Sequence, residues 1–218
     1  MDYTLSYIMN DDMPTKQRIM ICALDQFNKK GYSETTIRDI AKAVGITSGS
    51  IYGHFSSKEE ILQYMLNDYA EYTSNMFHSM DITPVLQKNP TGEGISLCIM
   101  SSISILTENV YYANLVHLIH QEQHRNPLFG GYILIRLKDT QEFIERIFDE
   151  LKGMNIIRPD ADAEYWGLIA FGVLHTIPTL HALNTRQNAP GYTMKDLAPI
   201  LRHMFDMILD LYKLSNEE

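Results

Sequence analysis

Apolar side chains recur at three- and four-residue steps along most of this chain, which is the period of helices that bury one face. Ile19, Ala23 and Phe27 follow that period and predict a helix over residues 14–30, where two lysines and a glycine mark its end. The alternation of a half-buried strand is not sustained anywhere in the sequence. The pattern therefore predicts an all-α fold.

Three more helices are predicted before residue 80, and polar residues mark where they begin. The second helix begins at residue 35 or 36, where Thr36 and Asp39 have the spacing of a capping box, and Gly45 ends it. A short third helix follows, capped by residue 47 or 48. Ser57 and Glu60 repeat the capping-box spacing at the start of a long fourth helix.

The rest of the chain is also predicted to be helical, apart from one break. Residues 80–94 hold two prolines and two glycines and predict a connection between helices. We therefore expect an N-terminal tail (1–13), a three-helix domain (14–62) and a larger helical domain (63–218). Apolar periodicity in the larger domain predicts helices over residues 93–108, 111–124, 128–152, 162–184 and 194–214.

Length and composition fit a protein that folds around its own core. The chain has 218 residues, 45% of them hydrophobic, and a chain of this size buries about 70% of the surface that its unfolded form exposes. We expect neither a signal peptide nor a membrane span, because the start is not basic and the most apolar runs contain histidine and proline. Cys22 and Cys98 lie in apolar stretches, so we expect buried thiols in a reducing cytoplasm.

The distribution of charge favours nucleic acid despite an acidic total. The net charge of −9 by itself argues against a polyanionic partner. Residues 15–58 nevertheless carry seven cations and three acids, a local charge of 7 − 3 = +4. The acidic excess lies outside this window, and the window could bind DNA phosphates.

Two short helices joined at a glycine, with basic flanks, have the arrangement of a helix-turn-helix. The segment "GITSGSIYGHF", at and after that glycine, has small side chains that let the backbone approach the major groove closely. Thr47 and Ser50 could hydrogen-bond to bases or phosphates, whereas Gly49 has no side chain to do so. Arg38 could supplement base recognition, and Lys58 stands at a helix N-terminus that attracts phosphate.

This part of the chain resembles the DNA-binding domain of the TetR (tetracycline-repressor) family of transcriptional regulators. The resemblance runs from residue 15 to residue 62 and rests on "RIMICALDQF" and "GYSETTIRDIAKAVGITSGSIYGHFSSKEEIL". From the residues alone, Tyr52 could instead pack on the first helix, and His54 could be a surface cap. The resemblance implies phosphate contacts from Thr36, Tyr52, His54 and Lys58, and groove-facing positions at Thr47, Ser48, Gly49 and Ser50.

The same resemblance gives the larger domain two roles, dimerisation and ligand binding. In the family the last two helices of each chain pair with those of its partner, and here residues 197–211 carry a wide apolar stripe that a monomer core could also absorb. We expect a homodimer that represses from a palindromic operator in duplex DNA and is released by a small organic effector. Aromatic, methionine and polar residues are the candidate pocket walls, although they are also ordinary core residues: Phe77, Met100, Ser104, Tyr111, Tyr112, His117, Gln121, Phe143, Trp166 and His175.

Other classes of function stay open as alternatives. His117, His120 and His124 share one helical face and could hold a metal, but the polar helix end indicates exposed or capping histidines, so we expect no metal and no cofactor. The P-loop, nucleophile-elbow, zincin and dinucleotide-binding motifs are missing from the sequence, so no enzyme is expected, although a dispersed triad leaves no motif. The second alternative is a DNA-binding regulator of the same fold that is controlled by a protein partner and not by a small molecule.

Overall fold

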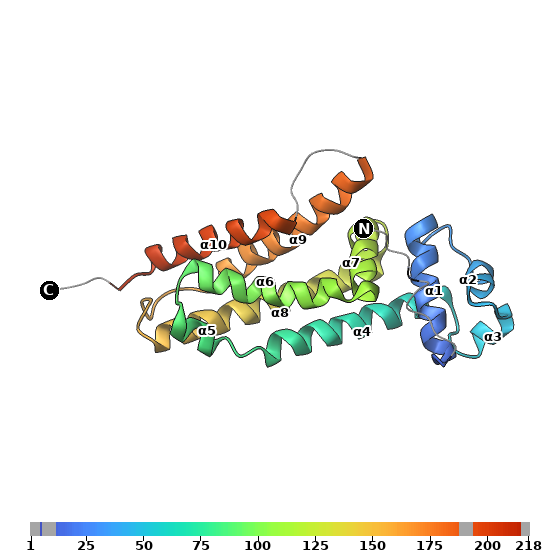
Figure 1. The fold of residues 1–218 in the computed structure, drawn as a ribbon, viewed down its shortest axis with the longest axis horizontal. Coiled ribbons are helices and arrows are strands. Elements are labelled where there is room, and N and C mark those ends of the chain that lie inside the picture. Colours follow the sequence, from blue (N-terminus) through green and yellow to red (C-terminus); the bar gives the residue numbers. More distant parts are fainter. Residues whose placement is uncertain (1–4, 6–11, 188–193, 215–218) are drawn as a thin grey trace. The chain divides into compact units, whose positions relative to one another are not determined.

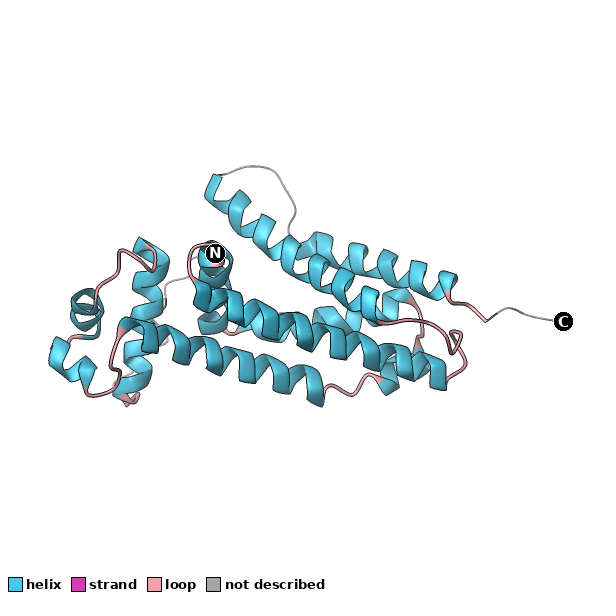
Figure 2. Ribbon diagram, turned by 180° about the vertical axis from the view of Figure 1, so that it is seen from behind, coloured by secondary structure: helices cyan, strands magenta, loops and turns pink. Residues whose placement is uncertain are grey.

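The computed structural model describes residue 5 and residues 12–187 and 194–214, with side chains throughout except at 102, 104–107, 177–187 and 194. Over these residues it contains helices and one isolated β-bridge, and no strands, which confirms the predicted fold class (Figures 1 and 2). None of the described helices is long and apolar enough to cross a membrane. The helices are α1 Thr15–Lys30, α2 Ile37–Val44, α3 Ser48–Tyr52, α4 Lys58–Ser79, α5 Thr83–Lys88, α6 Gly92–Glu108, α7 Val110–Glu122, α8 Pro127–Gly153, α9 Glu164–Gln187 and α10 Met194–Leu211.

One of these helices lies where the sequence predicts only a connection. α5 falls inside residues 80–94, and Pro84 stands in its first turn, where the missing N–H has no helical partner to lose. Leu86 on this helix is buried, so the segment is held by packing. The proline that indicates a break in the sequence therefore begins a short helix.

The chain divides into two compact units by packing. One unit consists of Met1–Glu71 and Leu106–Tyr132, and the other of Tyr72–Ile105 and Ile133–Glu218. The functional boundary predicted at residue 62 stays a prediction, because packing units do not test it.

The first unit buries the apolar faces of α1, α2, α3 and the start of α4. Phe27, Ile40, Ile51, Phe55 and Ile61 are almost completely buried. Full burial of such a side chain stabilises a fold by about 1.5–3 kcal/mol relative to exposure. These five side chains therefore hold the short helices α2 and α3, which are too short to be stable alone.

Polar and aromatic contacts complete the first unit. α1 packs on α7 as well as on α2, and Asn28 donates to the main-chain and side-chain oxygens of the buried Asn114, each at 3.2 Å. The ring of Tyr69 on α4 lies 5.2 Å from that of Tyr112 and 5.6 Å from that of Tyr132. This amide contact restricts how α1 and α7 can slide past each other, because a shifted register would break both of these hydrogen bonds.

The second unit has an apolar core to which α5, α6, α8, α9 and α10 contribute, with Phe143, Phe148, Leu197 and Phe205 among its buried residues. α8 and α9 approach each other closely at Gly167. A Cβ atom built there would lie 2.9 Å from the Cα atom of Gln141, so this position has no room for a side chain.

Polar contacts join the end of α4 to α8 in the second unit. Ser74 donates to the buried carboxylate of Asp139 at 2.7 Å. Arg146 donates to the main-chain oxygens of Phe77 at 2.7 Å and Met80 at 2.6 Å. These carbonyls lie in the last turn of α4 and directly after it, where main-chain oxygens lack a helical partner, so Arg146 caps the helix.

Candidate nucleic-acid interface

α2 begins and ends at residues that its sequence specifies locally. Thr36 accepts a hydrogen bond from the N–H of Asp39 at 3.2 Å, and Asp39 accepts one from the N–H of Thr36 at 2.9 Å. This is the capping box predicted from the spacing. Gly45 ends the helix at φ 79° and ψ 32°, a left-handed conformation that glycine adopts without strain.

α3 follows this turn at once. Thr47 accepts a hydrogen bond from the N–H of Ser50 at 3.1 Å, and the two hydroxyl oxygens lie 2.9 Å apart. Ile51 is fully buried, and it anchors the helix on the core of the first unit. Thr47, Gly49 and Ser50 are exposed on the other side, so α3 presents a small, uncharged surface to solvent.

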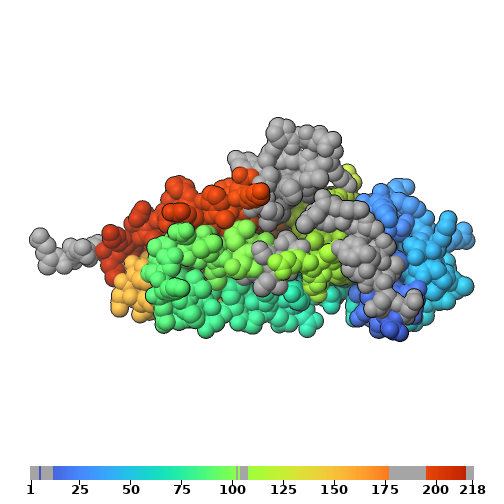
Figure 3. Space-filling view, viewed as in Figure 1, coloured from blue at the N-terminus to red at the C-terminus, as the bar shows by residue number. Residues whose placement is uncertain are grey.

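The side chains around α3 extend this exposed surface, and Figure 3 shows α2 and α3, in the lighter blues, at the surface of the molecule. Tyr52 is 57% exposed. Gly53, His54 and Arg38 are exposed too. The structure therefore brings the predicted groove-facing and phosphate-contacting residues of α2 and α3 onto neighbouring helices, with Tyr52 open to solvent.

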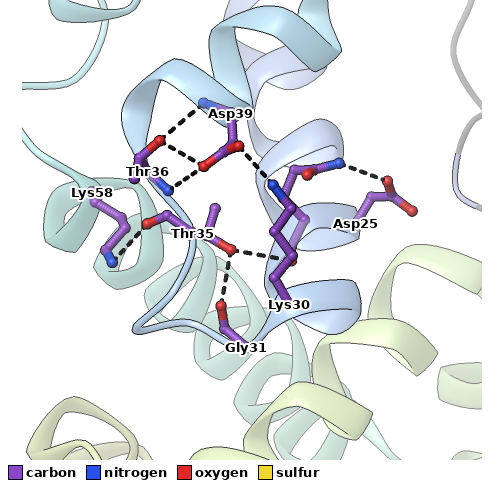
Figure 4. Close-up of polar contacts among 8 residues, drawn as sticks. Asp25, Lys30, Gly31, Thr35, Thr36, Asp39 and Lys58 are labelled. Atoms are coloured by element: carbon purple, nitrogen blue, oxygen red, sulfur yellow. Dashed lines mark hydrogen bonds and ion pairs between the residues drawn. The ribbon is translucent and has the colours of Figure 1, made fainter.

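The turn between α1 and α2 is held by a buried threonine (Figure 4). Gly31 has φ 88°, in the region that favours glycine. Thr35 is 1% exposed, and its hydroxyl lies 2.9 Å from the main-chain oxygen of Gly31 and 3.1 Å from that of Gln26. These two hydrogen bonds tie the turn to the end of α1. The residue after Thr35, Thr36, caps α2.

Lys58 binds this same turn from the start of α4. Its ammonium group donates to the main-chain oxygens of Tyr32 at 2.8 Å, Ser33 at 3.2 Å and Thr35 at 2.8 Å. The nitrogen also lies 4.4 Å from the centre of the Tyr32 ring. All three donors of the ammonium are in use. The predicted phosphate contact of Lys58 stays a prediction, and in this geometry it would require at least one of these bonds to break.

Other cations of the basic window are also engaged within the chain. Lys30 lies 2.6 Å from Asp39, and this bond, with those from Thr36, holds the pKa of the Asp39 carboxyl well below its usual range. Arg18 donates to the Val44 oxygen at 3.1 Å. Lys29 pairs with Asp25, and Lys16 lies over the Tyr64 ring.

Two cations of the window remain uncommitted. Arg38 and Lys42 are exposed on α2 and have no hydrogen-bonding or ionic partner among the residues that the structure describes. They lie four positions apart and so share one side of the helix. Their charges are therefore available to a polyanion, whereas the net charge of +4 counted from the sequence overstates what is free.

Sequence reasoning missed the part that Tyr32 and Thr35 play in this site. Their main-chain oxygens receive Lys58, which is 26 and 23 positions away. Every residue has a main-chain oxygen, so the sequence does not show which of them accept hydrogen bonds. No spacing rule predicts a contact between the N-terminus of a helix and a distant turn. The one available signal was the threonine pair at 35 and 36, of which only one residue can cap the helix.

The candidate pocket residues fall in both packing units. Phe77 and Phe143 are buried core residues of the second unit, 5.3 Å apart between ring centres, and Met100 and Trp166 pack on the same core. Beside Phe143 lies a void of about 10 Å³, room for one water molecule at most. The side chain of Ser104 lies outside the described residues. His175, which stacks on Phe171, also belongs to the second unit, whereas the first unit holds Tyr111, Tyr112, His117 and Gln121.

Three of the pocket candidates in the first unit make specific polar contacts. Tyr112 donates to Asp68 at 3.3 Å, and Gln121 contacts the imidazole of His117. The hydroxyl of Tyr111 is buried without a hydrogen-bonding partner in the described structure, and its burial raises the pKa of the phenol. A buried phenol without a partner is a group that a polar ligand atom could satisfy.

The described residues form no metal site, and the two cysteines are protonated thiols. Among the described residues, no group of three histidine, cysteine, aspartate or glutamate side chains is close enough to hold a metal ion. Burial raises the pKa of the thiols of Cys22 and Cys98. The raised pKa keeps them protonated and unreactive at neutral pH.

The helices that build this surface match a known family of sequences. The sequence model described as "Bacterial regulatory proteins, tetR family" matches residues 19–65, which cover α2, α3 and the adjoining parts of α1 and α4. Over these residues the chain is similar to the TetR family of regulators. Its relative KstR2 of Mycolicibacterium smegmatis, an HTH-type transcriptional repressor, is 26% identical over 155 residues, which are 68% of this chain and 70% of KstR2.

Solved structures have the same fold over nearly the whole chain. Salmonella enterica GusR has a TM-score of 0.63 at 20% identity and covers 93% of this chain and 98% of its own. SmeT is the repressor of a multidrug efflux pump of Stenotrophomonas maltophilia. It has a TM-score of 0.63 at 17% identity, and the match covers 95% of this chain and 94% of SmeT. SmeT has also been solved in complex with triclosan. The match over residues 19–65 and the similarity to the repressor KstR2 both support a DNA-binding transcriptional regulator.

Proposed function

We propose that this regulator represses transcription by binding a palindromic operator as a homodimer, in the cytoplasm, and that a small apolar effector releases it. The observation that carries the proposal is the exposed face of α3, where Thr47, Gly49 and Ser50 project no bulk and no charge. Such a surface lets a helix backbone come close to base edges. Thr36, Tyr52 and His54 would contact phosphates on either side.

A dimer is supported by apolar side chains left exposed on α9 and α10. Tyr165, Leu168 and Ile169 on α9 are each at least 45% exposed, and so are Met207 and Leu211 on α10. Clusters of large exposed apolar residues mark interaction surfaces in otherwise polar proteins. A second copy of the chain, joined by a two-fold axis through these helices, would cover both sets at once.

An effector is supported by the aromatic and polar candidates of the first unit, and by the buried hydroxyl of Tyr111, which has no hydrogen-bonding partner among the described residues. Adaptable apolar walls with a few polar groups are typical of small-molecule sites. An effector that favours the non-binding conformer by about 2.7 kcal/mol lowers operator affinity about a hundredfold. The triclosan complex of SmeT is a precedent for a small apolar ligand in a protein of this fold.

Selection from a pool of random duplexes tests DNA recognition. We expect the full-length protein to enrich one motif with dyad symmetry, with half-sites about 34 Å apart. Hydrophobic compounds that raise the melting temperature should then be titrated onto the selected complex. An unenriched pool would contradict operator binding, and compounds that stabilise the protein but leave operator affinity unchanged would contradict effector control.

A further inference from the structure

Lys58 occupies a site with three acceptors and no free donor. Its ammonium hydrogens point at the main-chain oxygens of Tyr32, Ser33 and Thr35, all within 3.2 Å, while the Tyr32 ring lies beside the charge. The side chain is half-buried. A lysine that served a phosphate in solution would be expected to extend into solvent with its donors hydrated. This lysine is instead bound within its own domain before DNA arrives.

The turn that Lys58 holds sets the position of α2. Thr35 contributes its oxygen to Lys58, and its hydroxyl binds back to the end of α1. Thr36 comes next and caps α2, and Asp39 in the first turn of that helix pairs with Lys30 on α1 (Figure 4). The start of α2 is thus fixed to α1 by Lys30 and to α4 by Lys58. α3 follows α2 through a single tight turn, so it takes its position from α2.

We infer that Lys58 is a positioning residue, which sets α2 and α3 for the major groove, and that the free cation Arg38 supplies charge to the DNA in its place. The inference rests on the proposed operator binding. Moving the Lys58 ammonium to a phosphate would strip up to three main-chain oxygens of their donor. Arg38 on α2 is exposed and has no such bonds to lose among the described residues.

The salt dependence of binding separates the two roles. A cation that neutralises a phosphate releases a counterion, so its loss lowers the slope of log affinity against log salt by about 0.9 per protomer. A positioning residue releases none. We therefore expect Lys58→Met to weaken binding to the selected operator by at least about tenfold, with the wild-type slope retained. Arg38→Met is the matched control and should lower the slope.

Two comparisons sharpen the test. Lys58→Met should lose much more affinity for the operator than for unrelated duplex, whereas a lost phosphate contact weakens both alike. Lys58→Gln should also keep the wild-type slope, because removing the charge of a positioning residue releases no counterion. A phosphate contact would lose slope in both variants. Circular dichroism and melting temperature confirm that each variant is folded, and Lys58→Gln carries the test if Lys58→Met does not fold.

The outcomes are distinct. Three results would each overturn the inference: equal slope losses in Lys58→Met and Arg38→Met, a slope loss in Lys58→Gln, or an undiminished affinity in folded Lys58→Met. Wild-type protein that binds no duplex selectively would instead contradict operator binding itself.

Discussion

Single residues join helices in the first unit through charge and hydrogen bonds. Asp39 accepts from Lys30 at 2.6 Å and from both the N–H and the hydroxyl of Thr36, at 2.9 Å and 2.6 Å. One carboxylate thus closes the capping box of α2 and ties that helix to α1. Because all these bonds favour the charged form, the pKa of Asp39 is held below its ordinary value.

The lowered pKa predicts how acid acts on stability. In the unfolded chain the pKa of an aspartate is about 3.9. The stabilisation from these bonds is therefore present above that pH, and it is lost as the pH falls toward the lower pKa of the folded state. We expect Asp39→Asn to flatten the fall of the unfolding free energy between about pH 5 and pH 2.5. Urea denaturation at a series of pH values measures it. An identical pH dependence in the two proteins would contradict this role of Asp39.

Local patterns predict the residue-scale contacts only in part. The spacing of Thr36 and Asp39 predicted their capping box, which the structure confirms. At the next start signal, Ser57 accepts from the N–H of Glu60 at 3.1 Å, but Glu60 reaches back to Ser56 rather than to Ser57. The Lys58 site could not be predicted, because its acceptors are main-chain atoms brought together by the packing of α1, α2 and α4.

At the scale of elements, helix periodicity predicts most of this fold. The last helices begin and end within a few residues of the predictions, and α7 ends at Glu122 rather than at residue 124. α5 was missed because a proline in the first turn of a helix and a proline in a loop look alike in a sequence. Distances between helices are also invisible to periodicity, and the close approach of α8 and α9 is one such case.

That close approach gives a test of packing in the second unit. Gly167→Ala would place its Cβ atom 2.9 Å from two carbon atoms of Gln141, one of them main-chain. We expect the free energy of unfolding to fall by about 1–3 kcal/mol, because α8 and α9 must move apart. Gly131→Ala on α8 is the matched control. It is exposed with no atom within 4 Å of the added carbon, so it should gain up to about 1 kcal/mol. Chemical denaturation measures the free energy of unfolding of both variants. An unchanged value for Gly167→Ala would contradict the expected clash, because the helices would then have room to adjust.

At the scale of the whole molecule, the exposed apolar residues of α9 and α10 determine the expected assembly. Leu168 is 52% exposed and Leu211 is 59% exposed. A monomer would leave this surface in water, at a cost of about 25 cal/mol for each Å² of apolar area. The proposed dimer would remove that cost and would also present two α3 helices to one duplex.

Leu168→Glu tests the dimer surface. Two like charges brought together and desolvated at a two-fold interface disfavour association. We expect light scattering to give about 50 kDa for the wild type, twice the chain mass of 25.1 kDa, and a mass near 25.1 kDa for the variant at micromolar concentration. Glu145→Gln, an exposed position on α8, is a control that should leave the mass unchanged. A variant that stays dimeric would place the interface elsewhere.

Operator binding as proposed requires two α3 helices of one dimer to read two half-sites on the same face of a duplex. It is tested most directly by titrating the protein onto the selected operator and onto the same operator with five base pairs inserted at its centre. The insertion turns one half-site by about half a helical turn, to the opposite face. We expect two protomers to bind tightly to the original duplex, and binding to the lengthened duplex to be no stronger than binding to unrelated DNA. Equal affinity for the two duplexes, or one protomer bound to the original, would contradict it.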